Sequence, residues 1–182
     1  MRLHPVFPLC YNIHEWRCVI SSIIIDGYNL IGIYHKDLEN ERRRLVERLV
    51  EYKNLKGHDI TVVFDGWKNG SGEENQSVVN GVSVVYSRLG EKADSVIKRM
   101  ISSDKRQWIV VTSDRDIADH AWRCGSVAVS SEEFQNIFEK SERIDSGDFE
   151  FLEEEDYEPE KKGSPRKLSK KEKAKKRAIS KL

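Results

Sequence analysis

The sequence has 182 residues, 38% hydrophobic and 34% charged, which is enough for one domain with a buried core plus an appendage. No run of eighteen apolar residues exists, so the sequence excludes a transmembrane helix and no membrane partner is expected. The 31 basic and 31 acidic residues give a net charge of zero, which argues against nucleic-acid binding only if the charges are evenly mixed.

The N-terminal segment, residues 1–19, contains two prolines and no continuous apolar stretch, so it is not a signal peptide. We expect it to be an extension that precedes the folded domain. The three cysteines, Cys10, Cys18 and Cys124, form no recognisable disulfide framework. An odd number of cysteines without a secretion signal indicates reduced thiols and a cytoplasmic location.

The first half of the domain alternates between strand and helix patterns. A strand is predicted over residues 19–25, where β-branched residues lead to the turn signal Asp-Gly at 26–27. Residues 38–56 carry apolar side chains at helical spacing among many charges and are followed by glycine. A second buried strand is predicted over residues 60–64 and again ends in Asp-Gly, at 65–66.

The alternation continues through the second half. A third strand is predicted over residues 82–86, and the preceding Asn-Gly at 80–81 is also consistent with a hairpin that pairs residues 78–79 with it. A helix is predicted over residues 93–101 and a fourth strand over residues 108–112.

The last elements predicted before the charged segment are a helix over residues 117–124, a short strand over 127–129 and a helix over 131–140. Ser131 is the expected N-cap of the final helix. Strands that alternate with helices predict an α/β fold with a mostly parallel sheet covered on both faces.

Charge is strongly segregated at the C-terminal end. Residues 150–160 contain seven acidic and no basic residues, whereas residues 161–182 contain eleven basic residues and the single acid Glu172. We therefore expect an acidic linker over residues 146–160 and a disordered, charged C-terminal tail over residues 161–182. Such a tail is typical of an arm that binds phosphate backbones, and a solubilising tail that folds back onto the acidic block is the alternative.

Acidic residues follow several of the predicted strands. Asp26 and Asp65 end two of them, Asp114 and Asp116 follow a third, and Asp94 opens the helix after another. The carboxyl ends of parallel strands share one edge of a sheet, so these carboxylates are expected to lie close together. Like charges at close range raise each other's pKa, and a Mg²⁺ or Mn²⁺ ion would relieve this repulsion. The alternative is that each acid only forms a turn or caps a helix.

Other catalytic patterns are absent from the sequence. It contains no G-x-x-x-x-G-K-[ST] phosphate-binding loop, no G-x-G-x-x-G after the first strand and no G-x-S-x-G nucleophile elbow. A metal-dependent reaction at the acidic edge therefore remains the favoured chemistry.

Four segments together resemble a known family. Residues 23–32 (IIIDGYNLIG), 62–66 (VVFDG), 91–97 (EKADSVI) and 111–116 (VTSDRD) resemble, in order and spacing, the motifs of the YacP-like branch of the NYN domains. These domains are relatives of the PIN-domain nucleases. The resemblance implies a three-layer α/β/α PIN-like nuclease domain over residues 20–145 and metal-dependent cleavage of RNA.

Carried over by position, the resemblance assigns roles to individual residues. The catalytic and metal-binding residues are Asp26, Asp94, Asp114 and Asp116. The supporting residues are Asn29, Asp65, Glu91, Thr112 and Ser113.

The resulting hypothesis is a cytoplasmic, Mg²⁺- or Mn²⁺-dependent ribonuclease, with endonucleolytic cleavage expected. Its partner is RNA, either free or within a ribonucleoprotein such as the ribosome. The candidate RNA contacts are Lys92, Arg99 and Arg115 for the backbone, Trp67 for stacking on an unpaired base, and Lys170, Lys171, Lys175, Lys176 and Arg177 in the tail.

Two rival hypotheses remain open at this point. One is a non-catalytic RNA-binding module of the same fold. The other is a phosphohydrolase for small phosphate esters. A D-x-D-type phosphatase would need an acid at position 28, where this sequence has Tyr28.

Overall fold

The computed structural model describes residues 21–32, 37–66, 74–104, 106–145 and 168–182. The N-terminal extension, the acidic linker over 146–160, the first part of the charged tail and Trp67 lie outside the described residues. The boundaries predicted for these segments stay predictions.

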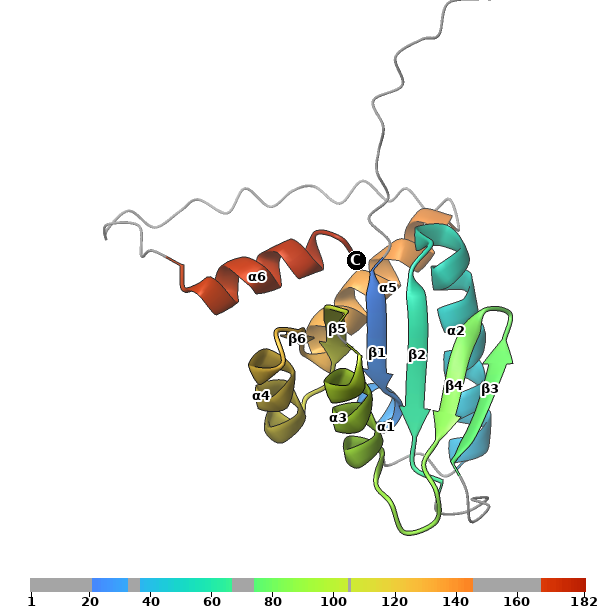
Figure 1. Cartoon of the computed structure of the whole chain (residues 1–182). Helices are drawn as coiled ribbons and strands as arrows, with labels where there is room; N and C mark the ends of the chain where they lie inside the picture. Colours follow the sequence, from blue (N-terminus) through green and yellow to red (C-terminus); the bar gives the residue numbers. More distant parts are fainter. Residues whose placement is uncertain (1–20, 33–36, 67–73, 105, 146–167) are drawn as a thin grey trace, which may run out of the picture.

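A six-stranded sheet forms the centre of the domain, with the strand order β3-β4-β2-β1-β5-β6 (Figure 1). All neighbouring strands are parallel except β3, which runs antiparallel to β4 at one edge. The mostly parallel α/β sheet predicted from the sequence is therefore confirmed. The strands are β1 (Ser22–Asp26), β2 (Asp59–Phe64), β3 (Asn75–Val79), β4 (Val82–Tyr86), β5 (Trp108–Val111) and β6 (Val127–Val129).

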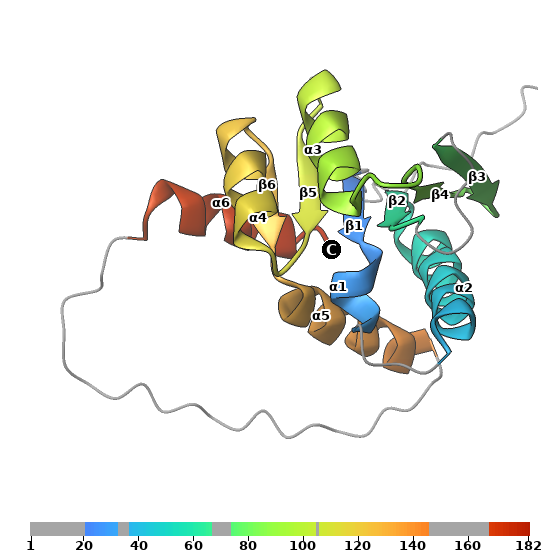
Figure 2. The same cartoon turned by 90° about the horizontal axis from the view of Figure 1, so that it is seen from below.

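Helices cover both faces of this sheet, as Figure 2 shows in a view from below. Helices α1, α2, α5 and α6 pack on one face, and α3 and α4 pack on the other. This is the three-layer α/β/α arrangement that was expected. None of the described helices is long and apolar enough to cross a lipid bilayer. The helices are α1 (Gly27–Ile31), α2 (Leu38–Lys56), α3 (Ala93–Ser103), α4 (Arg115–Arg123), α5 (Ser131–Asp145) and α6 (Lys170–Ile179).

The central strand β1 shows why the sheet needs both helix layers. Successive side chains of a strand point to opposite faces, so Ile23 and Ile25 pack towards α2 and α5 while Ile24 packs towards α3. All three side chains are fully buried. A strand that is apolar on both faces can be stable only between two covering layers.

The hairpin alternative is confirmed for residues 75–86. β3 pairs with β4 in antiparallel register, and Asn80 and Gly81 form the turn with φ angles of 46° and 88°. Asn and Gly are the residues that most readily adopt positive φ, which such a two-residue turn requires at both positions.

The N-cap predicted for the helix over residues 131–140 is wrong by one residue. The Ser130 hydroxyl accepts a hydrogen bond from the Glu133 backbone N–H at 3.3 Å, and the Ser130 N–H donates to the Glu133 carboxylate at 3.0 Å. These reciprocal bonds form a capping box at the start of α5. Ser131 is buried instead. The capping-box spacing distinguishes the two serines, because Glu133 lies three residues after Ser130 whereas Phe134 lies three residues after Ser131.

The predicted disorder of the tail is wrong for residues 168–182. A capping box between Ser169 and Glu172 starts α6, and Ala178 and Leu182 are buried against the core on the face of the sheet that α2 covers. Although apolar residues are few here, Ala174, Ala178 and Leu182 recur every four residues and therefore share one side of the chain. Composition alone did not reveal this short apolar stripe.

Two polar contacts hold the chain end after α6 against α2 and the start of β2. The Tyr52 hydroxyl donates to the Leu182 carbonyl at 2.7 Å, and Nε2 of His58 donates to the Lys181 carbonyl at 2.9 Å. The other ring nitrogen of His58 accepts from the Ser21 N–H at 3.4 Å. His58 must be neutral to make both bonds. Burial lowers its pKa below the ordinary value, an effect only partly offset by the bond to Lys181.

We expect acid to destabilise the docking of α6. The pKa of His58 is lowered in the folded state, so its contribution to stability is present above the unfolded pKa of about 6.5 and is lost as the pH falls below it. His58→Gln keeps one donor and one acceptor but cannot titrate. Urea unfolding at pH 7.5 and 5.5 should show a smaller loss of stability in this variant than in the unmodified chain. Equal losses in both proteins would contradict the assignment.

Candidate active site

The candidate site lies where the parallel strands β1, β2 and β5 end, at the lower edge of the sheet in Figure 1. Asp26 is the last residue of β1, Asp65 follows β2, and Thr112 follows β5. Helix α3 starts beside this edge, with Asp94 in its first turn. The parallel topology therefore brings residues from four separate segments to one edge of the sheet.

Asp26 is a buried carboxylate, with only 4% of its surface exposed. It caps α1 by accepting a hydrogen bond from the Asn29 N–H at 3.3 Å, and it accepts a further bond from the Asn29 side-chain amide. The Thr112 hydroxyl donates to it at 3.5 Å. Asn29 and Thr112, both predicted as supporting residues, thus hold the Asp26 carboxylate in place.

Gly27 allows α1 to lie close to the sheet. A Cβ atom at this position would lie 2.2 Å from a ring carbon of Phe64. The absence of a side chain therefore lets Phe64 pack directly beneath the start of α1, which places Asn29 against Asp26. The Asp-Gly pair is more than a turn: it is the point at which the helix and strand β2 meet.

Two neighbouring acids act on the ionisation of Asp26. Burial is the largest effect and raises the pKa of the Asp26 carboxyl, while the hydrogen bonds from Asn29 lower it. The negative charges of Asp94 and Asp65 raise this pKa further. A carboxylate in this setting is stabilised in its charged form by a nearby cation.

Asp65 has a structural task in addition to its charge. Its carboxylate accepts a hydrogen bond from the Ala93 N–H at 2.5 Å, at the start of α3. Lys92, the N-cap residue of that helix, makes no capping bond with its own side chain. Asp65 therefore caps α3 from a different segment of the chain. Because Asp94 directly follows Ala93, this contact also positions Asp94.

Ser87, which was not among the predicted site residues, connects the loop after β2 with the loop before α3. The Ser87 hydroxyl accepts from the Gly66 N–H at 3.0 Å and donates to the Glu91 carbonyl at 2.7 Å. Ser87 is buried, at 1% exposure. No local pattern marks this serine, because Gly66, the partner that makes it a link between two loops, lies 21 residues away in the chain.

Asp114 and Asp116 are placed differently from one another. Asp114 caps α4 by accepting from the Asp116 and Ile117 N–H groups at 2.7 and 3.2 Å. Its own N–H donates to the Thr112 hydroxyl at 3.1 Å, so it lies beside the group that contacts Asp26. Asp116 is exposed and paired with Lys98, which lowers the pKa of its carboxyl.

Of the basic residues predicted to contact the RNA backbone, one is paired with acids of the protein and two are exposed. Arg99 is paired with Glu91 at 2.5 Å and with Glu74, so its charge is already balanced by two carboxylates, and Arg99 in turn lowers the pKa of Glu91. Lys92 and Arg115 are exposed beside the site, as is Ser113. Arg99 therefore has a clear structural role, whereas Lys92 and Arg115 are open to a ligand.

Helix α6 brings further basic residues to the same edge. A hollow of about 380 Å³ is lined by Ser113 and Arg115 on one side and by Lys171 and Lys175 on the other. Lys175 pairs with Glu133 at 2.6 Å, and the Lys171 ammonium lies 5.6 Å from the centre of the Trp122 ring. The start of α6 thus forms one wall of a hollow beside the acidic site, and the acids Asp114 and Glu172 line this hollow together with the basic residues.

The donor set at the edge suits a hard divalent cation, because its ligands are carboxylate and hydroxyl oxygens. Among the described residues, no group of three or more His, Cys, Asp and Glu side chains is arranged to hold a metal ion. The predicted set of four carboxylates is therefore not gathered into one cluster. Mg²⁺ commonly binds through only one or two carboxylates and retains water molecules, which fits the pair Asp26 and Asp94.

Comparison with known proteins identifies the family. The family model described as YacP-like NYN domain matches residues 23–181. This chain belongs to the YacP-like NYN domain family. NYN domains are PIN-like nucleases, so the resemblance inferred from the four motifs is confirmed. The match extends through α6, beyond the region in which the motifs were recognised, and is consistent with a C-terminal helix that is part of the domain.

Relatives from Bacillus subtilis support the same assignment. The protein YacP of Bacillus subtilis (strain 168) is 30% identical over 105 residues, which span 52% of this chain and only 61% of the length of that relative. A crystal structure of Rae1 (YacP) from Bacillus subtilis is similar with a TM-score of 0.59 at 25% identity, covering 70% of this chain and 79% of that one. A second crystal structure, of a mutant of the same protein, gives a TM-score of 0.57 at 25% identity and covers 70% of this chain and 80% of that one.

We expect Asp94→Asn to lower the pKa of Asp26, because the substitution removes one of the negative charges that raise it. A carbon-detected NMR titration of the Asp26 carboxyl would measure the change. Asp116→Asn is the matched control, since its carboxylate is exposed and already paired with Lys98. An identical Asp26 pKa in the Asp94 variant and in the unmodified chain would contradict the proposed proximity.

Proposed function

We propose that this NYN domain is a metal-dependent endoribonuclease that hydrolyses RNA phosphodiester bonds at the carboxyl edge of its sheet. The observation that carries the proposal is the buried Asp26 carboxylate, held by Asn29 and Thr112 and facing the charges of Asp94 and Asp65. Keeping a carboxylate buried beside other acids costs stability, and such a cost is typical of a functional site.

Asp26 and Asp94 are the residues we propose as ligands of Mg²⁺ or Mn²⁺, with Asp114 beside them. A bound ion of this kind supplies charge stabilisation for the phosphodiester and lowers the pKa of water. The protein's own part is to hold the carboxylates: Asn29 and Thr112 orient Asp26, and the cap from Asp65 positions α3 and therefore Asp94. Asp116, exposed and paired with Lys98, is proposed as a more distant member of the site.

The proposed substrate contacts lie around this edge. Lys92 and Arg115 are exposed next to the acids, and Lys171 and Lys175 line the hollow that borders Ser113. Phosphate groups are the chemistry that such lysines and arginines recognise without regard to sequence. Of the other basic residues of α6, Lys170 and Lys176 are exposed and are proposed as further phosphate contacts, whereas Arg177 lines a separate hollow beside Ser21, Gln107 and Trp108. RNA bound in a ribonucleoprotein stays a prediction.

Asp94→Asn should reduce Mn²⁺-dependent cleavage of single-stranded RNA by about 100-fold or more, because it removes a proposed ligand. Gel analysis of labelled RNA with Mn²⁺ and with EDTA would measure this. Asp119→Asn, at an exposed position of α4, is the matched control and should cleave normally. Asp116→Asn should have a milder effect, since Lys98 already balances its charge.

A non-catalytic RNA-binding role on the same fold is the competing function. Purified protein that binds RNA but cleaves none with any divalent ion would support this alternative over hydrolysis. Cleavage that survives Asp94→Asn unchanged would show that the activity resides elsewhere. Turnover of a small phosphate ester without RNA cleavage would favour a phosphohydrolase.

Replacing Lys171 and Lys175 with Gln should weaken RNA binding and reduce its salt dependence by about one unit of slope per lost phosphate contact. These substitutions are sharper than deletion of the tail, because deletion would also remove the packing of Ala178 and Leu182. Lys181→Gln, which changes a charge near the other end of α6, is the control. Binding measured by fluorescence anisotropy at several salt concentrations would show an unchanged slope if these lysines do not contact RNA.

A further inference from the structure

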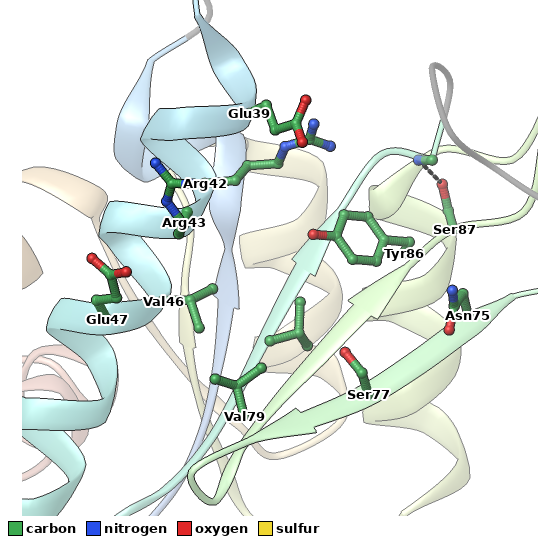
Figure 3. A pocket seen from close by; sticks show the side chains of 12 residues that line it. Glu39, Arg42, Arg43, Val46, Glu47, Asn75, Ser77, Val79, Tyr86 and Ser87 are labelled. Carbon is green, nitrogen blue, oxygen red and sulfur yellow. Dashed lines mark hydrogen bonds between the residues drawn. The ribbon is translucent and has the colours of Figure 1, made fainter.

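A groove separates α2 from the β3–β4 hairpin on the side of the sheet that α2 covers, and it has a volume of about 440 Å³. Figure 3 shows Arg42 and Arg43 on the α2 side and Tyr86, Ser77 and Asn75 on the strand side. Its base is apolar, with Val46, Val79 and Val84 among the lining residues. The volume falls within the range of pockets that hold small ligands or parts of larger ones.

One end of the groove approaches the candidate active site. Gly66, which directly follows Asp65, and Ser87 line its end at the carboxyl edge. A row of aromatic rings runs in the same direction: the Tyr28 and Phe64 rings are 5.6 Å apart, and the Phe64 and Tyr86 rings are 5.7 Å apart. Tyr28 belongs to α1, the helix that Asp26 caps. A ligand that crosses the acidic edge can therefore extend into this groove.

The polar groups of the groove could bind a planar ring that carries hydrogen-bond donors and acceptors along its edge. The Arg42 guanidinium lies 5.7 Å from the centre of the half-buried Tyr86 ring. Among the described residues neither Arg42 nor Arg43 forms an ion pair, whereas the adjacent Arg44 is paired with Glu41 at 3.0 Å. The acids Glu39 and Glu47 also line the groove.

The net charge of the groove does not favour a phosphate, because the two lining arginines are balanced by Glu39 and Glu47. The aromatic face and guanidinium favour stacking with a planar ring. The carboxylates of Glu39 and Glu47, with the side chains of Asn75 and Ser77, offer acceptors and donors for polar groups at the edge of that ring. A nucleobase has both features.

We propose that this groove, between α2 and the β3–β4 hairpin, binds an unpaired nucleobase of the RNA strand whose backbone crosses the acidic edge. The proposal rests on the proposed function, since it supplies the part of the substrate next to the cleaved bond. The base stacks on the Arg42 guanidinium and on the accessible part of the Tyr86 ring, whose other neighbour is Phe64. A base inside a duplex has both faces covered, so the groove selects single-stranded RNA.

The test uses the full chain carrying Asp94→Asn, so that binding is measured without cleavage. The probe is a short single-stranded RNA containing 2-aminopurine, whose fluorescence falls when it stacks. Tyr86→Leu should weaken binding by about 5-fold or more and remove the quenching, whereas Tyr86→Phe should retain both. Arg42→Gln should also weaken binding and reduce quenching. Arg44→Gln, the same change two residues further along α2, should do neither.

The outcomes separate this inference from the proposed function. Unchanged affinity and quenching in both Tyr86→Leu and Arg42→Gln would overturn the base-binding groove, while cleavage by the unmodified chain would still support the nuclease. Loss of quenching in these variants, with no cleavage under any ion, would support the groove in an RNA-binding module. Tyr86 packs on Phe64, so if Tyr86→Leu unfolds, Arg42→Gln with its Arg44→Gln control decides the result.

Discussion

The buried carboxylate of Asp26 is the constraint on which the carboxyl edge of this sheet depends. Strand β1 is apolar on both faces and runs between two parallel neighbours, so its last residue, Asp26, is almost completely buried. A charge there must be hydrogen-bonded or balanced. The N–H groups of Asn29 and the hydroxyl of Thr112 supply the hydrogen bonds, and Gly27 lets α1 come close enough to make them.

The acids of this edge serve as helix caps and as site residues at the same time. Asp26 caps α1, Asp65 caps α3 from another loop, and Asp114 caps α4. The two roles are compatible, because a cap fixes the position of the carboxylate and of the helix start together. Capping bonds use only part of the acceptor capacity of a carboxylate, so capping does not exclude contact with a cation. Asp116 differs because its partner is a lysine of a neighbouring helix.

Helix α6 shows where reasoning from composition was insufficient. Its segment is dominated by lysine and arginine and holds too few apolar residues to form a core of its own. Three apolar residues at four-residue spacing nevertheless suffice to stabilise the helix when they pack on an existing core. Their burial against other elements offsets the entropy lost when the helix becomes ordered. This docking also carries Lys171 and Lys175 to the edge where the acids lie. The basic segment and the acidic site thereby become parts of one surface.

The sequence by itself determined the alternation of strands and helices, the parallel sheet and the family, because hydrophobic periodicity and the spacing of the four motifs are local properties. It also placed Asp26, Asp65 and Asp94 at one edge, since parallel strands share their direction. Only the tertiary structure decided which acids face each other, that Arg99 is bound by two glutamates, that Ser87 ties two loops and that α6 docks on the core. Each of these depends on contacts between residues far apart in the chain, and no local pattern records them.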